Sequence, residues 1–241
     1  MKTFKPKLSI LPKEQRALWT KLDPVKDLGF TLYGGTAIAL RLGHRTSVDF
    51  DFFTDRKLDK TALYKVLPIL SSGDVLQEAR DTLVVSVGPN VTSGPVKLSF
   101  FGEMKFGRFG DPELTGDKVL RVASINDLMA TKVKVLFDRA EQKDYDDLAA
   151  MIAAGADIAT GIAIARQMFP NLNPRIALQA LTHHKDVPRL SLKARRVLIK
   201  AATSVGDLPA VQRASYSLSG DGSGGADGAA GGPPPRRACK P

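Results

Sequence analysis

Residues 33–53 read YGGTAIALRLGHRTSVDFDFF and combine a pair of glycines, a short apolar-periodic run and an alternating segment. Gly34 and Gly35 lie directly before the run Thr36–Leu42, which has helical periodicity. Glycines allow a tight turn and a close approach to a ligand, and the new helix offers free N–H groups and a positive dipole end to phosphate. The stretch therefore predicts a phosphate-binding turn before a helix, although Gly-Gly-Thr alone is equally typical of a plain turn.

The alternating segment 47–53 predicts a strand that carries two carboxylates on one face. Asp49 and Asp51 project together about 6.6 Å apart, because side chains alternate along a strand, and Phe50 and Phe52 take the other face. Two carboxylates on one face repel each other unless a cation neutralises them, and Mg²⁺ prefers oxygen ligands. A solvated edge strand is the alternative, but the apolar opposite face and the glycine turn upstream favour a metal site.

Basic residues separate the glycines from the aspartates. Arg41, His44 and Arg45 can bind triphosphate or RNA phosphate, arginine as a forked donor and protonated histidine as a point donor. A lone histidine is more often structural, so the sequence favours Arg41 over His44 as a nucleotide-binding residue.

A second charged cluster lies in the later part of the chain, where Lys132 precedes the stretch Lys143-Asp-Tyr-Asp-Asp147. On one helix Asp144 and Asp147 are neighbours at i, i+3, so they share a charged face while apolar residues such as Leu148 pack. A solvated helix face explains this pattern at first sight. The concentration of acids in a strongly basic chain favours a functional cluster instead.

Composition narrows the class of protein. The chain has 241 residues, is 43% hydrophobic and 25% charged, and has 35 Lys and Arg against 25 Asp and Glu, a net charge of +10. This excess favours polyanionic partners such as RNA, DNA or nucleotides. One cysteine, Cys239, excludes an intrachain disulfide and a cysteine zinc site. We find no apolar run long enough to span a bilayer and no signal peptide, and we expect a cytoplasmic protein without a membrane partner.

The local pattern divides the chain into three parts. Residues 1–122 alternate short strand and helix signals and predict a mixed α/β domain, and residues 123–214 have helical periodicity and predict an all-helical domain. The α/β part includes predicted strands 75–79, 83–87 and 96–101. From Ser215 to Pro241 the sequence is rich in Gly, Ser, Ala and Pro, which predicts a disordered low-complexity tail.

Taken together, these motifs resemble the AbiEii/AbiGii toxin family of the nucleotidyltransferase (DNA polymerase β-like) superfamily. The resemblance covers roughly residues 30 to 150 and includes the Gly-Gly turn, Asp49-Phe-Asp51, Lys132 and Asp144-x-x-Asp147. It implies a nucleotidyltransferase-type mixed sheet with helices, an α/β fold in the α+β sense, followed by an all-helical domain.

The resemblance also implies a set of site residues. Asp49 and Asp51 would hold Mg²⁺, and Lys132 and Asp144 would complete the catalytic site, with Lys132 on the triphosphate and Asp144 positioning the acceptor or a basic side chain. The residues that would hold the nucleotide are Gly34, Gly35, Thr36, Arg41, Ser47 and Lys132.

One departure from the superfamily pattern affects the metal count. Many members supply a third carboxylate from a later strand, but the strand 96–101 offers Ser99 at that place, and Glu103 lies beyond Gly102. The sequence therefore leaves one-metal and two-metal sites open.

The leading functional prediction is Mg²⁺-dependent transfer of NMP from an NTP to a hydroxyl of RNA, such as a tRNA 3′ end. The resemblance adds a toxin role in a toxin–antitoxin or phage-defence system, with an antitoxin protein as partner. The alternatives are a catalytically inactive nucleotide- or RNA-binding module and a transferase that places NMP on a protein.

Overall fold

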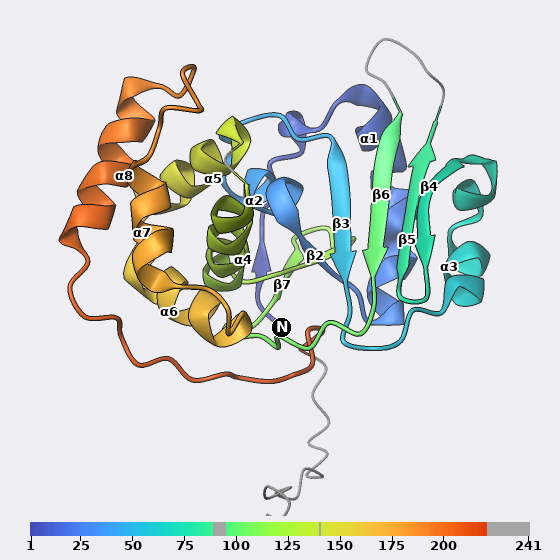
Figure 1. The fold of residues 1–241 in the computed structure, drawn as a ribbon. Helices are drawn as coiled ribbons and strands as arrows, with labels where there is room; N and C mark the ends of the chain where they lie inside the picture. The colour runs from blue at the N-terminus through green and yellow to red at the C-terminus, as the bar shows by residue number, and fades with distance from the viewer. Residues whose placement is uncertain (89–94, 140, 221–241) are drawn as a thin grey trace, which may run out of the picture.

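The computed structural model describes residues 1–88, 95–139 and 141–220, which form a mixed sheet followed by helices (Figure 1). The strands are β1 (Thr3–Phe4), β2 (Thr31–Tyr33), β3 (Asp49–Phe53), β4 (Asp74–Ala79), β5 (Thr82–Val87), β6 (Val96–Phe101), β7 (Glu113–Thr115) and β8 (Arg121–Val122). The α-helices are α1 (Lys13–Leu18), α2 (Gly34–Leu42), α3 (Lys60–Val66), α4 (Ile125–Asp138), α5 (Gln142–Ala153), α6 (Ile158–Met168), α7 (Pro174–Thr182) and α8 (Leu192–Ser204). The 3-10 helices are η1 (Leu8–Ile10), η2 (Trp19–Leu28) and η3 (Pro68–Ser72). The predicted α/β fold with a helical second half is confirmed.

The strand order places the two aspartates inside the sheet. Within the described residues, the sheet is 8-stranded with the order β1-β7-β8-β2-β3-β6-β5-β4. β3 pairs antiparallel with β2 and parallel with β6. Asp49 and Asp51 therefore lie on a strand with neighbours on both sides, and the edge-strand alternative is wrong.

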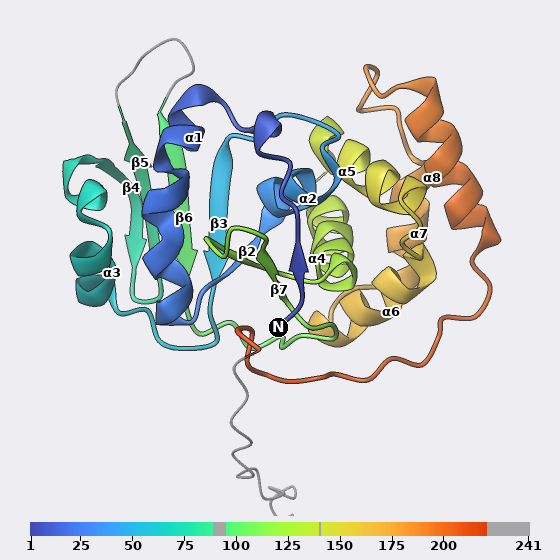
Figure 2. The same ribbon diagram turned by 180° about the vertical axis from the view of Figure 1, so that it is seen from behind.

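The sheet face opposite these aspartates is an apolar core. Phe50 and Phe52 are fully buried, and the rings of Phe52 and Phe100 stack with centroids 5.2 Å apart. α1 and η2 lie across this face (Figure 2), and η2 contributes the buried Trp19 and Leu22. Burying the phenylalanines on one side of β3 therefore directs its carboxylates to the other side.

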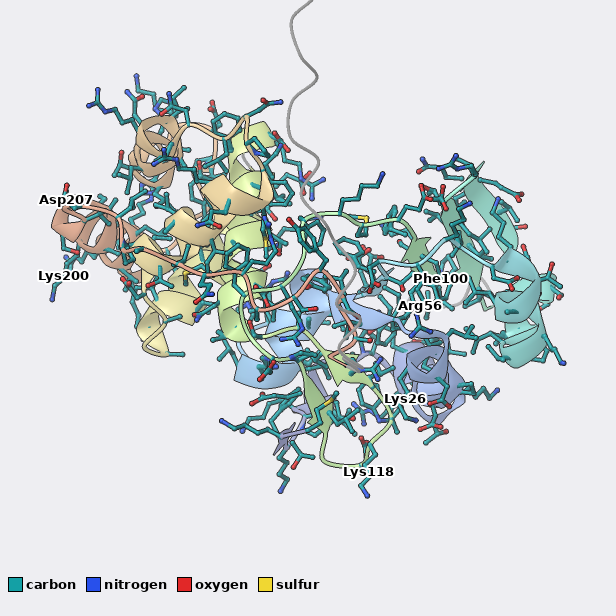
Figure 3. The ribbon with its side chains drawn as sticks, turned by 90° about the horizontal axis from the view of Figure 1, so that it is seen from below. Lys26, Arg56, Phe100, Lys118, Lys200 and Asp207 are labelled. Carbon is teal, nitrogen blue, oxygen red and sulfur yellow. The ribbon has the colours of Figure 1, made fainter. Side chains whose placement is uncertain are left out.

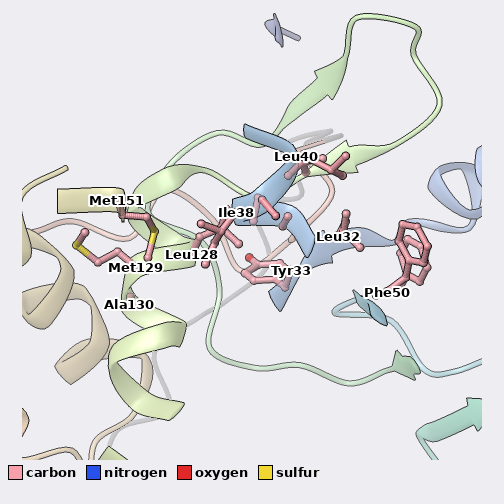
Figure 4. Packing of buried hydrophobic residues seen from close by; sticks show 14 of the residues in the cluster. Leu32, Tyr33, Ile38, Leu40, Phe50, Leu128, Met129, Ala130 and Met151 are labelled. Atoms are coloured by element: carbon pink, nitrogen blue, oxygen red, sulfur yellow. The ribbon is translucent and has the colours of Figure 1, made fainter. Parts of the chain in front are cut away.

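The helical half shares its core with the sheet. Ser124 caps α4 by accepting the Asp127 N–H at 3.1 Å, as its place before the helix predicts. Leu128 of α4 and Ile38 of α2 belong to one buried cluster and lie side by side in Figure 4. The last strand ends at the predicted boundary of residues 122 and 123, but the apolar core continues across it.

Several elements differ from the sequence prediction. The short strands β1, β2, β7 and β8 were not predicted, because two or three residues are too few to show an alternating pattern. The apolar spacing in residues 13–28 predicts a helix interrupted at Asp23-Pro24, whereas the structure has the short α1 followed by a 3-10 helix from Trp19 that runs through Pro24. The ring of a proline inside an α-helix clashes with the carbonyl four residues before it, which disfavours α-helical winding through this segment.

The structure corrects the start of the predicted tail, because residues 215–220 pack against the α/β half. Leu218 is 1% exposed, its N–H donates to Asp55 Oδ1 at 2.8 Å, and its carbonyl accepts the Thr31 hydroxyl at 3.0 Å. After α8 the chain runs back beneath α6 to this position in both ribbon views (Figures 1 and 2). The remaining predicted tail, 221–241 with Cys239, and most of the loop 88–95 lie outside the described residues.

The two halves lie at opposite ends of the molecule. Viewed from below, Lys200 and Asp207 mark the far end of the helical half, whereas Arg56 and Phe100 lie on the sheet side (Figure 3). No helix within the described ranges is both long and apolar enough to cross a membrane.

Candidate active site

A cavity of about 580 Å³ lies between the polar face of the sheet and the helix α4. Its walls come from the glycine turn, the strands β3 to β6, and α4 with the segment that follows it. All the predicted site residues line it except Arg41 and Asp144. Tertiary structure thus brings together most of the residues that the sequence motifs singled out.

The glycine turn fits tightly against charged side chains of the cavity. Gly34 has φ +73°, and a Cβ added there would overlap the Asp51 carboxylate. A Cβ on Gly35 would overlap the Arg45 guanidinium. Both glycines therefore leave room for a neighbouring charged side chain, and at Gly34 the positive φ also favours glycine.

Thr36 and Ser47 connect this turn to the aspartate strand. Both side chains are buried, their hydroxyl oxygens lie 2.8 Å apart, and the Thr36 hydroxyl donates to the Asp49 carbonyl. Both residues line the cavity, and their hydroxyls are hydrogen-bonded to each other. Thr36 and Ser47 thus fix the start of α2 against the start of β3.

The two aspartates face the cavity with Lys97 and Ser99 beside them. In the β3–β6 register Asp49 pairs with Lys97 and Asp51 with Ser99, and Lys97 Nζ lies 3.1 Å from Asp49 Oδ2. Burial and the charge of Asp49 raise the pKa of Asp51, and a hydrogen bond from Ser99 opposes this effect.

This environment fits a cation held by two carboxylates. Asp51 is buried beside a like charge, so a divalent cation would stabilise its ionised form, and the available donors are hard oxygens. Among the described residues no group of three His, Cys, Asp or Glu side chains is placed to hold a metal. The strand position of a third carboxylate is taken by Ser99.

Lys132 enters the cavity from α4 and is held by two buried acids. Its Nζ donates to Asp144 Oδ1 at 3.0 Å and lies 2.9 Å from Asp147 Oδ2, and both carboxylates are 0% exposed. The solvated helix face that the sequence allowed is therefore wrong. Of the two roles predicted for Asp144, its geometry matches the positioning of a basic side chain.

Asp147 is the residue that sequence reasoning did not assign to the site. Arg45 donates to both of its carboxylate oxygens, at 2.6 and 2.8 Å, and His44 Nε2 donates to Oδ1 at 2.8 Å. Burial opposes ionisation, but the hydrogen bonds from His44 and Arg45 and the charge of Lys132 outweigh it and lower the pKa of Asp147. Its i, i+3 spacing from Asp144 was the available signal.

Arg41 lies outside the cavity, contrary to its prediction as a nucleotide-binding residue. Its guanidinium pairs with Glu113, donates to the Ala123 carbonyl at 2.8 Å and lies 4.3 Å above the centre of the Phe4 ring. Position along the helix explains the difference, because Arg41 is in the last turn of α2, whereas the cavity lies at the first turn.

The site combines a glycine turn at a helix start, two aspartates on the adjacent strand and a cavity lined by cationic side chains. This combination defines a nucleotidyltransferase. The comparison with protein families gives the same class, because residues 16–203 match the model described as "Nucleotidyl transferase AbiEii toxin, Type IV TA system". The chain belongs to this AbiEii family, and its enzyme class is nucleotidyltransferase.

Individual proteins of known sequence or structure are also similar to this chain. An uncharacterized protein of Aquifex aeolicus is 30% identical over 183 residues, which cover 73% of this chain and 84% of the relative. The crystal structure of JHP933 from Helicobacter pylori has a TM-score of 0.51 and 16% identity, with 83% of this chain and 96% of that chain covered, and shares the fold. An antigenic nucleotidyltransferase-like protein from Paracoccidioides brasiliensis has a TM-score of 0.43 and 18% identity, with 69% and 93% covered.

Proposed function

We propose that the protein transfers NMP from an NTP to a hydroxyl of RNA in a Mg²⁺-dependent reaction, with a tRNA 3′ end as acceptor. The observation that carries the proposal is the junction of Asp49 and Asp51 with the Gly34-Gly35 turn inside a cation-lined cavity. This arrangement places two carboxylates beside the start of a helix, where phosphate oxygens bind well.

The triphosphate would lie between the start of α2 and the basic side chains of the helical half. No side chain caps α2, so its first N–H groups face the cavity without a side-chain acceptor. Lys132, Arg139 and Lys143 line the same cavity from the side of α4 and α5. The positive end of the α2 dipole and these cationic side chains together favour binding of the β- and γ-phosphates of the NTP between them. The same groups favour the pyrophosphate that leaves.

The paired aspartates would hold the metal. When bound, Mg²⁺ supplies positive charge to the phosphate oxygens and lowers the cost of the charge that develops during transfer. Asp49 and Asp51 provide its protein ligands, and Ser99 in place of a third carboxylate favours one well-held ion. Lys132 adds a second positive charge, preorganised by the Asp144 and Asp147 carboxylates.

The transfer itself forms a bond from the acceptor oxygen to the α-phosphorus and breaks the bond to pyrophosphate. The hydroxyl proton would pass to a carboxylate of the aspartate pair. Asp144 does not take this role, because its carboxylate is fully buried and bound to Lys132.

An RNA acceptor is supported by charge. The net charge of +10 favours a polyanion over an acceptor protein of ordinary composition. In this proposal the enzyme acts as the toxin of a two-protein system, with a cognate antitoxin, because the matched family is described as a Type IV toxin–antitoxin system.

The test is an incubation of the purified chain with each α-labelled NTP, total tRNA and Mg²⁺. We expect label in RNA, release of pyrophosphate, and loss of both when the metal is chelated. Asp49→Asn provides the inactive control. Label in protein would identify a protein acceptor, and NTP binding without transfer to either acceptor would identify a non-catalytic binding module.

A further inference from the structure

The edge strand β4 contains an irregularity at the mouth of the cavity. Its pairing with β5 passes from Val75 opposite Val85 to Gln77 opposite Val84, so Leu76 is one extra residue. A bulge of this kind bends the strand and re-aims side chains, and bulges are frequent beside active sites. Here the consecutive residues Leu76 and Gln77 both line the cavity, which regular alternation would not allow.

The strand registers connect Gln77 with the catalytic aspartate in one row across the sheet. Asp51 pairs with Ser99, Ser99 with Val84, and Val84 with Gln77. Three strand spacings separate Asp51 from Gln77, a distance of about 14 Å along the sheet. Every residue of this row lines the cavity, so the row forms a continuous floor from the reaction centre to the edge strand.

The two ends of the cavity differ in charge. The helical end carries Lys132, Arg139 and Lys143, whereas the β4 end is formed by Leu76, Gln77 and Val84. Leu76 is 58% exposed, an unusual exposure for a large apolar side chain beside an active site. The acid that follows on β4, Glu78, forms an ion pair with Lys60 at 2.9 Å and does not line the cavity. The β4 end therefore suits a neutral ring with polar edges, not a phosphate.

The direction of NMP transfer assigns different roles to the two ends of the cavity. In phosphoryl transfer the attacking and leaving oxygens lie roughly in line on opposite sides of the phosphorus. The cationic helical end suits the leaving pyrophosphate, so the acceptor hydroxyl approaches from the sheet side, past Asp51 and Ser99. The next group along that path meets Leu76 and Gln77.

We propose that the β4 bulge is the subsite for the terminal nucleoside of the RNA acceptor. Leu76 and Val84 pack against the base or ribose, and the Gln77 amide hydrogen-bonds to the edge of the base. The Gln77 side-chain amide offers one hydrogen-bond donor and one acceptor side by side, which matches the N7 acceptor and N6 donor of adenine. This inference rests on the proposed function, because it assigns the acceptor side of the same reaction.

The test uses RNA hairpins with a four-nucleotide single-stranded 3′ end that differ only in the terminal nucleoside. For Gln77→Ala we expect KM for the preferred RNA to rise about tenfold and the preference among terminal bases to fall by a similar factor. KM for the NTP should stay unchanged. Leu76→Ser should raise KM for all the hairpins alike, because an apolar contact does not read the base edge.

Glu78→Gln is the matched control, one residue further along β4, and should leave both KM values unchanged. Equal melting temperatures of the variants and the wild type would show that β4 is intact. A rise in KM for the NTP, or a changed choice among NTPs, would overturn the proposal and place the NTP base at β4. Unchanged kinetics in Gln77→Ala would overturn it as well.

The same experiment distinguishes failure of the proposed function from failure of the acceptor subsite. A wild-type protein that transfers no NMP to any hairpin or to total tRNA overturns both proposals together. A wild-type protein that labels RNA, with Gln77 variants that match it, overturns only the acceptor subsite.

Discussion

Arg45 and Asp147 form a two-point ion pair between the loop after α2 and the helix α5. Arg45 Nε lies 2.6 Å from Asp147 Oδ1, and Nη2 lies 2.8 Å from Oδ2. The same guanidinium occupies the space beside Gly35 in which a Cβ would not fit. Through this pair, α5 holds the Arg45 guanidinium beside the glycine turn, so a helical element supports the candidate active site.

Replacement of Asp147 should destabilise the protein strongly. Asp147→Asn removes the buried charge that faces Arg45, His44 and Lys132, and the loss of one partner of a buried ion pair costs about 3 to 5 kcal/mol. Urea denaturation measures this free energy of unfolding. Asp146→Asn, on the less buried side of the same helix, should change it by less than about 0.5 kcal/mol. A variant at 147 as stable as the wild type would show that the network contributes nothing to stability.

The stabilisation by Asp147 should depend on pH in a defined direction. The folded state lowers the pKa of Asp147, so the folded protein keeps the carboxylate ionised at a pH where the unfolded chain already binds a proton. The contribution is fully present above the ordinary carboxyl pKa of about 4 and is lost as pH falls below it toward the folded pKa. The difference in unfolding free energy between wild type and Asp147→Asn should shrink as pH falls below about 4. A difference that grows below about pH 4 would contradict this assignment.

Neutralisation of either cavity aspartate should abolish transfer and leave the fold intact. Asp49→Asn and Asp51→Asn each remove a ligand of the proposed Mg²⁺, and both should melt at or slightly above the wild-type temperature without metal, because repulsion between like charges is relieved. Label transfer to RNA and thermal melting are the two measurements. Glu103→Gln is the control, since Glu103 pairs with Arg80 outside the cavity and should keep full transfer. Full activity of either asparagine variant would refute the metal assignment.

Lys132 and Asp144 should affect both stability and transfer. Lys132→Ala should reduce transfer by about 100-fold or more, the scale of a lost preorganised charge, and Asp144→Ala should also reduce it because Lys132 loses its anchor. Each variant should be less stable, and the double variant should cost less than the sum, because the two side chains form one buried pair. Lys134→Ala, on the exposed side of α4, is the control for both measurements. Near-normal turnover in both alanine variants would confine the active site to the sheet half.

Two truncations should separate the packed C-terminal segment from the residues after it. Removal of 221–241 should leave the melting temperature unchanged, because that sequence is rich in glycine, alanine and proline and offers little apolar surface. Removal of 215–241 should cost about 2 kcal/mol or more, since it also exposes the site that buries Leu218. Leu218→Ala in the full chain should reproduce most of the second effect. Equal melting temperatures for both truncations would show that the 215–220 contacts do not stabilise the fold.

The local patterns were sufficient for the elements that carry the site. Alternation in 47–53 predicted the strand with Asp49 and Asp51 on one face, and the glycine pair predicted the start of α2, because both signals depend on neighbours a few residues apart. Local spacing also explains the helix caps Asp59 and Ser124, because each side chain accepts the backbone N–H of the residue three positions later.

Tertiary structure alone decided which charged residues meet. Arg41 and Arg45 are similar in sequence context, but one binds Glu113 and the other binds Asp147, more than a hundred residues away in the chain. Their orientation depends on where α2 ends and on how α5 packs against it, which is a property of the folded core. The exposed surface of Leu76 and the burial of Leu218 have the same origin, since burial is set by distant segments that local sequence does not identify.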